Sequence, residues 1–243
     1  MTAMRRRRSS LLLCLAVVAA VVLLAAGIYV NDYYRADAAA LAALESGGTV
    51  TVEQREELVA FCPTEPQAGL IFYPGGKVEH TAYAPLLRAL AEKGILCVLP
   101  EMPLRLAVLD ADAAAGVPEQ FPEVEDWYLG GHSLGGAMAA GYAADHGGAY
   151  RGLLLLASYS TEDLSDTELR VLSLYGGEDG VLDFEKYEEY RSNLPADTVE
   201  QIIDGGSHAC FGSYGPQEGD GTAAITGEEQ IRITAEAVLD WMN

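Results

Sequence analysis

Residues 130–136 read GGHSLGG, with Ser133 among four glycines. It follows DWYLG (residues 126–130), a run typical of a buried strand, and precedes AMAAGYAAD (residues 137–145), which favours a helix. A serine between glycines at such a junction belongs either to a flexible connector or to a turn too tight for larger side chains. The pattern Gly131-x-Ser133-x-Gly135 in this setting predicts the second, a nucleophile elbow.

Outward from this elbow, strand patterns alternate with helix patterns along the chain. Strands are expected at residues 49–54, 57–63, 68–73, 95–100, 126–131, 151–158, 169–177 and 198–204, and helices at 81–94, 104–115, 134–147, 184–194 and 226–242. Short strands separated by helices form a mostly parallel sheet. The sequence therefore predicts an α/β fold with a doubly wound, mostly parallel sheet, helices on both faces, and a site at the carboxyl ends of the strands.

A serine nucleophile needs a base and a carboxylate. His208 lies in the glycine-rich loop DGGSHACFG (residues 204–212) after the last expected strand, and it is the candidate base. Asp179 follows the strand at 169–177 and is the preferred acid, with Glu178 as the weaker alternative. Asp183 is better interpreted as the cap of the helix that begins at Phe184.

The remaining histidines have other interpretations. His80 opens an expected surface helix and His146 closes one, so both are expected to be solvated. His132 lies inside the elbow, and its side chain is expected to point away from Ser133.

Two backbone N–H groups are needed to stabilise the oxyanion of an acyl-transfer reaction. One is expected from Leu134, directly after the serine. The second is expected from the loop Pro74–Lys77 after the strand at 68–73, with Gly76 as the first choice and Lys77 as the next.

The amino terminus has a different character. Leu11–Val30 is a run of 20 residues without a charge, which as a helix would span roughly 30 Å, and Arg5–Arg8 precede it. Because arginines stay on the cytoplasmic side, the sequence favours residues 1–30 as an uncleaved, single-pass membrane anchor with the rest of the chain extracytoplasmic. The alternative is a cleavable signal peptide, whose candidate cleavage site at residues 25–27 lies inside the apolar run. Residues 31–48 are expected to be a stalk and residues 49–243 the catalytic domain.

Charge and cysteine content limit the possible partners. Residues 1–35 hold five arginines and one aspartate, a net charge of +4, so the remainder of this −21 chain carries −25. Such a surface repels phosphate backbones, which excludes a nucleic-acid partner. The cysteines outside the run form no metal-binding pattern, and a disulfide between Cys62 and Cys97 requires neighbouring strands.

With Ser133, Asp179 and His208 in this order on an alternating sheet, the chain resembles the α/β-hydrolase superfamily, in particular its small bacterial dienelactone-hydrolase-like branch. FYPGGKVEHTAYAPLLRALAEKG, GGHSLGGAMAAGYA, YGGEDGVLD and GGSHACFGSYGPQEGDG carry the likeness, which covers about residues 66 to 243. The nucleophile is serine, whereas dienelactone hydrolases use cysteine.

The combined interpretation is a membrane-anchored serine hydrolase that cleaves small carboxylic esters through an acyl-enzyme, without a metal or organic cofactor. Acyl transfer and amide cleavage are alternatives that use the same residues, and a non-catalytic binding module is an alternative of another class. Residues 158–169 are too polar and acidic to form an apolar lid, so an open site that prefers short acyl groups is expected. The oligomeric state is not indicated.

Overall fold

The computed structural model describes residues 15, 17–22, 24 and 27–243, in two units, residues 1–33 and 34–243. In the first unit the described residues up to Asn31 are helical. Within the described part of the chain, no helix is long and apolar enough to span a membrane. The predicted span, residues 11–30, includes positions 11–14, 16, 23, 25 and 26, which lie outside the described residues, so it stays a prediction.

The second unit is built on an eight-stranded sheet with the order β1-β2-β4-β3-β5-β6-β7-β8. Both pairings of β2 are antiparallel, and all pairings from β4 to β8 are parallel. The predicted mostly parallel α/β sheet is thus confirmed. The strands are β1 (Val50–Gln54), β2 (Leu58–Pro63), β3 (Ala68–Tyr73), β4 (Ile95–Pro100), β5 (Trp127–His132), β6 (Gly152–Leu156), β7 (Arg170–Gly176) and β8 (Val199–Ile203).

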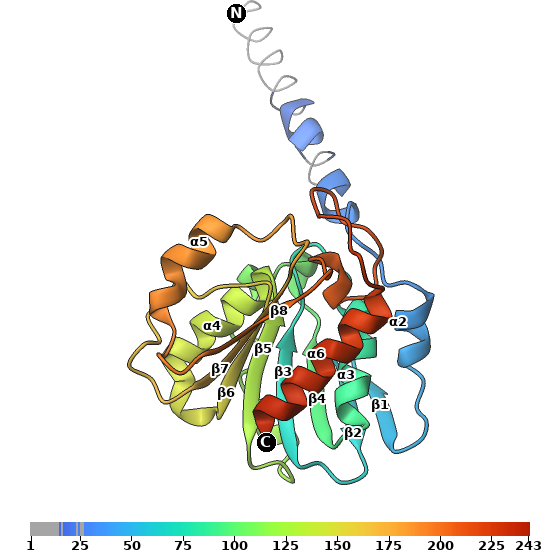
Figure 1. Cartoon of the computed structure of the whole chain (residues 1–243). Helices are drawn as coiled ribbons and strands as arrows, with labels where there is room; N and C mark the ends of the chain where they lie inside the picture. The colour runs from blue at the N-terminus through green and yellow to red at the C-terminus, as the bar shows by residue number, and fades with distance from the viewer. Residues whose placement is uncertain (1–14, 16, 23, 25–26) are drawn as a thin grey trace, which may run out of the picture. The chain divides into compact units, whose positions relative to one another are not determined.

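Helices cover both faces of this sheet. They are α2 (Ala38–Ala43), α3 (Ala84–Ala91), α4 (Leu134–His146), α5 (Phe184–Glu189) and α6 (Gly227–Met242), with short 3₁₀ turns between them. Figure 1 shows α3 and α6 together on one face and α4 on the opposite face. Each face has its own apolar cluster, because alternate strand residues point to opposite sides.

Local sequence signals set the limits of the covering helices. The leucines of α3, at positions 86, 87 and 90, are fully buried, and each contributes about 1.5–3 kcal/mol relative to exposure. The turn after this helix ends at Gly94, which adopts a positive φ of 93°. Helix α6 begins after Thr226, whose side chain accepts the N–H of Glu229. Gly94 and Thr226 thus set the end of the turn after α3 and the start of α6, whereas the buried leucines pack α3 against the sheet.

The segment predicted as a stalk, residues 31–48, belongs to the folded unit from Tyr34 onwards. It contains α2, in which Ala40 is fully buried. The guanidinium of Arg88 on α3 donates to the carbonyl oxygens of Ala43 (3.3 Å) and Gly47 (3.1 Å). The predicted start of the domain at Thr49 is therefore too late, because the alanine-rich helix has small side chains that pack closely on α3.

Residues 104–115, predicted as a helix, contain no α-helix. The segment holds 3₁₀ turns at Pro103–Arg105 and Ala107–Leu109. Leu104 and Arg105 have positive φ angles of 51° and 61°, which interrupt a right-handed helix.

Cys62 and Cys97 lie on neighbouring strands, β2 and β4, yet both are free thiols. Cys97 faces Phe61 in the register and packs in the cluster of α3 and α6. Cys62 packs against the opposite cluster, so the sheet separates the two sulfur atoms.

Candidate active site

Ser133 forms the turn between β5 and α4. Its backbone has φ 53° and ψ −123°, an unusual conformation for a residue with a side chain that costs about 1–3 kcal/mol. The turn is held because the N–H of Ser133 donates to Leu156 O (2.9 Å), and its carbonyl accepts from Ser158 Oγ (2.8 Å) and from Ala137 N (3.2 Å). The strained turn places the serine side chain at the carboxyl end of the sheet.

The glycines two residues before and after the serine are required by close backbone packing. A Cβ atom at Gly131 would lie 2.5 Å from the carbonyl carbon of Gly135. A Cβ atom at Gly135 would lie 2.3 Å from Tyr73 O, at the end of β3. Only residues without a side chain fit both positions, which is the physical content of the Gly-x-Ser-x-Gly pattern.

His208 and Asp179 meet at the same edge of the sheet. Nδ1 of His208 lies 2.9 Å from Oδ2 of Asp179, and both side chains are buried. The other carboxylate oxygen, Oδ1, accepts the N–H groups of Val181 and Leu182, both at 2.8 Å. Because a carboxylate only accepts, a neutral His208 donates its Nδ1–H to Asp179 and keeps a lone pair on Nε2.

The serine and the histidine share one small cavity. It has a volume of about 260 Å³, and its walls include Ser133, Leu134, Tyr159, Leu182 and His208. The arrangement thus presents a hydroxyl, an imidazole with a carboxylate behind it, and the amino-terminal end of α4 to the same space. This set of groups suits nucleophilic attack on a carbonyl carbon.

Asp183 also borders this cavity, but the carboxylate that pairs with His208 is that of Asp179. Asp183 is exposed, and its carboxylate accepts the N–H of Lys186 (3.1 Å) as the cap of α5. Glu178 is exposed on the same loop.

His132 is fully buried, and its ring lies 4.4 Å from the ring of His208. Its Nδ1 is 2.7 Å from the hydroxyl of Tyr83, which also accepts the N–H of Gly75 (3.1 Å). Burial holds the pKa of His132 well below its ordinary value, and repulsion from His208 when that ring is protonated acts in the same direction. A neutral imidazole thus packs beside His208, a contact that sequence reasoning did not identify.

The other two histidines lie away from this cavity. His146 is exposed and stacks on Tyr142. His80 is half-buried rather than solvated, and this burial lowers its pKa.

Among the predicted oxyanion donors, Lys77 is occupied, because its N–H donates to Arg105 O (2.9 Å). Gly76 lies beside Leu134, since a Cβ atom at Gly76 would be 3.0 Å from Leu134 Cδ2. Within residues 27–243, the N–H groups of Gly76 and Leu134 have no protein acceptor. Leu134 lines the cavity that contains Ser133 and His208, and Gly76 lies beside Leu134 but is not part of the cavity wall, so the pair stays a prediction.

Phe211 and Tyr214 pack into the core rather than line the cavity. Phe211 is fully buried, Tyr214 is nearly so, and both belong to the cluster around Tyr83. In the segment at 158–169, Leu164 is fully buried and packs in the apolar cluster on the α4 side of the sheet. In the described part of the chain, no group of three or more histidine, cysteine, aspartate or glutamate side chains is placed to hold a metal ion.

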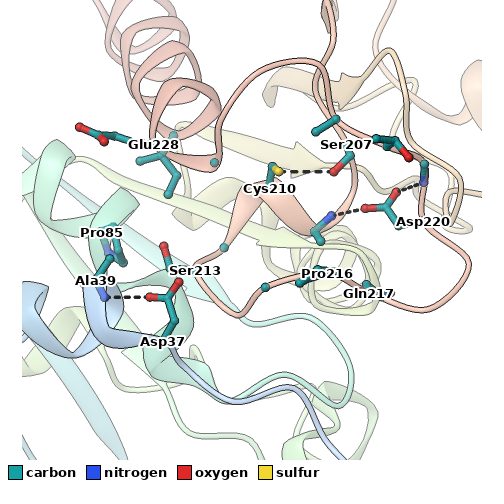
Figure 2. A pocket seen from close by; sticks show the side chains of 18 residues that line it. Asp37, Ala39, Pro85, Ser207, Cys210, Ser213, Pro216, Gln217, Asp220 and Glu228 are labelled. Atoms are coloured by element: carbon teal, nitrogen blue, oxygen red, sulfur yellow. Dashed lines mark hydrogen bonds between the residues drawn. The ribbon is translucent and has the colours of Figure 1, made fainter.

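A larger cavity of about 730 Å³ is lined in part by the loop that carries His208 (Figure 2). Ser207, Ala209 and Cys210 line it, but His208 does not. Asp220 also lines it, and this carboxylate binds the backbone of the loop that carries His208. No sequence signal pointed to Asp220, because its partners are backbone groups up to 40 residues away.

Comparison with known proteins agrees with this architecture. Residues 69–232 match the model described as "Alpha/beta hydrolase family", more than half of the chain. The sequence matches none of the curated proteins.

Three solved structures illustrate the likeness in fold. An α/β-hydrolase enzyme from a metagenome of Mar Chica lagoon sediments in Morocco is 16% identical, with a TM-score of 0.59 over 78% of this chain and 98% of that one. Dienelactone hydrolase from Anabaena variabilis is 14% identical, with a TM-score of 0.58 over 80% and 97%. Carboxylesterase CesB from Bacillus subtilis is 12% identical, with a TM-score of 0.59 over 84% and 94%.

Proposed function

The chain belongs to the α/β-hydrolase family, and we propose that it is a serine hydrolase that cleaves small carboxylic esters. The observation that carries this proposal is the pairing of His208 with Asp179 beside a cavity that also contains the strained Ser133. Each of these groups has the chemistry that one step of ester cleavage needs.

In this mechanism Ser133 Oγ attacks the ester carbonyl carbon while Nε2 of His208 accepts the hydroxyl proton. The N–H groups of Leu134 and Gly76 donate to the oxyanion of the tetrahedral intermediate. The amino terminus of α4 faces this negatively charged oxygen and stabilises it further. The tetrahedral intermediate expels the alcohol, which takes the proton from His208. Water then attacks the acyl-enzyme with His208 as the base, which releases the acid and restores Ser133.

Asp179 supports both steps without touching the substrate. Its carboxylate holds the Nδ1–H tautomer of His208 and stabilises the imidazolium that forms at each proton transfer. The two backbone N–H groups on Oδ1 fix the direction of this carboxylate.

The cavity favours a short acyl group. Its volume of about 260 Å³ lies below the roughly 300–1,000 Å³ of pockets that hold drug-sized ligands. Phe211, Tyr214 and Leu164 are buried, so no apolar cover is available from these side chains. The charge of −25 on the residues after 35 disfavours anionic substrates.

The small cavity predicts how activity depends on the length of the acyl chain. We expect kcat/KM to fall by about tenfold or more from p-nitrophenyl butyrate to p-nitrophenyl octanoate, and to fall again for palmitate, because longer chains exceed the cavity. Steady-state assays with acetate, butyrate, octanoate and palmitate esters below their critical micelle concentrations measure this. A rise toward the long chains would instead indicate a lipase.

The proposal places this hydrolase at the cell membrane, with residues 1–30 as a single-pass anchor and the folded unit outside the cytoplasm. Support comes from the uncharged run Leu11–Val30 after Arg5–Arg8. Among the described residues of this run, the leucine, valine and isoleucine side chains at positions 15, 17, 18, 21, 22, 24 and 28 are exposed, and that of Val30 is half-buried.

Truncation tests both the anchor and the corrected domain start. The full chain should stay with membranes after an alkaline carbonate wash, whereas a chain that begins at Tyr34 should be soluble with unchanged kcat/KM. A chain that begins at Thr49 lacks α2 and should lose about 2–3 kcal/mol of stability, which lowers Tm by roughly 5–10 °C.

Circular dichroism melts of the two shorter chains provide the comparison. Equal Tm values would mean that residues 34–48 contribute nothing to the fold. Release of the full chain by carbonate would contradict the anchor.

A further inference from the structure

Asp220 is bound by four backbone N–H groups. Its Oδ1 accepts from Gly180 (3.1 Å), His208 (3.2 Å) and Gly221 (2.8 Å), and its Oδ2 accepts from Ala209 (2.8 Å). Figure 2 shows Asp220 at the wall of the larger cavity, with dashed lines from its carboxylate to two of these hydrogen-bond partners. Its hydrogen-bonding capacity is thereby used by the protein itself.

These bonds join the two loops that carry the proposed acid and base. Gly180 directly follows Asp179, and His208 is the proposed base itself. The backbone of residues 219–221 also approaches the acid loop closely, since a Cβ atom at Gly180 would lie 2.6 Å from Gly219 O. One carboxylate therefore bonds to the backbone of both loops and helps to set the spacing between them.

Other hydrogen bonds hold the residues that precede His208 in this loop, without involving the N–H of His208. Gln230 accepts the N–H of Ser207 (2.9 Å) and donates to its carbonyl (2.8 Å). The N–H of Glu178 donates to Gly206 O (2.8 Å). Among the described residues, the side chain that accepts the N–H of His208 is Asp220.

The charge state of Asp220 suits this role. Burial alone would raise its pKa, but the bonds from Ala209, Gly180 and His208 outweigh burial and hold the pKa below its ordinary value. Both oxygens therefore act only as acceptors at neutral pH, as four N–H donors require.

We propose that Asp220 is a positioning residue for the base, which holds the His208 backbone so that its imidazole stays aligned with Asp179 and Ser133. This inference rests on the proposed serine-hydrolase function. An imidazole displaced by about 1 Å loses roughly 10²-fold in rate. Substrate binding involves other groups, so the effect falls on kcat rather than on KM.

Asp220→Asn is the test variant, and Glu218→Gln is the matched control. The asparagine keeps the size of Asp220, but its Nδ2 donor would replace Oδ2 and face the N–H of Ala209. Glu218 lies two residues away on the same loop, is exposed, and loses the same charge. We expect Asp220→Asn to lower kcat about 10²-fold with KM within twofold, and Glu218→Gln to match wild type.

A spectroscopic readout separates positioning from a loss of folded protein. The His208 Nδ1–H that bonds to Asp179 should give a low-field proton resonance in wild type and in Glu218→Gln, broadened or absent in Asp220→Asn at a temperature where circular dichroism shows it folded. Folded Asp220→Asn with kcat within twofold of wild type would overturn the proposal. A kcat loss with an unchanged low-field resonance would also overturn it.

If Asp220→Asn does not fold, Asp220→Glu is measured by the same criteria, because it keeps the charge and both acceptors one methylene further out. Its kcat should fall with a shifted low-field resonance, and wild-type values of both would overturn the proposal. The Ser133→Ala variant distinguishes a failure of the Asp220 proposal from a failure of the proposed serine-hydrolase function. If Ser133→Ala is inactive and folded Asp220→Asn matches wild type, only the role of Asp220 fails, whereas activity in Ser133→Ala would refute the hydrolase mechanism itself.

Discussion

Ser133→Ala should lower kcat for p-nitrophenyl butyrate by about 10⁴- to 10⁶-fold, because it removes the atom that forms the acyl-enzyme. His208→Ala should lower kcat by a similar factor, since an unassisted hydroxyl is a weak nucleophile. The double variant should be little worse than either single one, because the groups act as a unit. Steady-state kinetics on the chain that begins at Tyr34 give these ratios.

Ser192→Ala is the matched control, because Ser192 is an exposed serine. Its kcat should equal that of wild type. If Ser133→Ala kept more than a tenth of the wild-type kcat while it remained folded, the covalent mechanism at this residue would be contradicted.

Asp179→Asn should lower kcat by about 10⁴-fold through the tautomer of His208. The N–H groups of Val181 and Leu182 both donate to Oδ1, so the asparagine oxygen is expected to stay there. The amide NH₂ then faces Nδ1 of His208 as a donor and forces the imidazole proton onto Nε2. In that form Nε2 cannot accept the proton of Ser133.

Asp183→Asn is the control for this variant. Asp183 caps α5 through Lys186 N, so its replacement should cost at most about 1 kcal/mol of stability and leave kcat near wild type. Thermal melts and steady-state kinetics on both variants make the comparison. An active Asp179→Asn together with an inactive Asp183→Asn would assign the acid to Asp183.

The parts that sequence predicted best are those where local chemistry is decisive. The alternation of strands and helices is confirmed, because buried strands such as β3 and amphipathic helices such as α3 carry strong periodic patterns. Gly131 and Gly135 are required by backbone contacts of 2.5 Å or less for any added Cβ. Such a requirement can be inferred from spacing alone.

The parts that sequence missed depend on contacts between distant segments. The stalk prediction failed from Tyr34 onwards because an alanine-rich helix gives no sign of its partner, which is Arg88 on α3. The sequence could not show that the Lys77 N–H is unavailable as an oxyanion donor, because the N–H bonds to the carbonyl of Arg105, a residue on a distant segment. The contact between His132 and His208 likewise requires the strand order. Tertiary partners, rather than propensity, determine each of these features.

Labelling with a fluorophosphonate probe shows whether Ser133 is an activated nucleophile, because the probe reacts with a serine only when a base and an oxyanion site activate it. The native chain should acquire one adduct, mapped by peptide mass spectrometry to Ser133. The adduct should be absent from heat-denatured protein and from Ser133→Ala. A native, folded protein that is not labelled, or that is labelled at another serine, would contradict the account and favour a non-catalytic binding module on this fold.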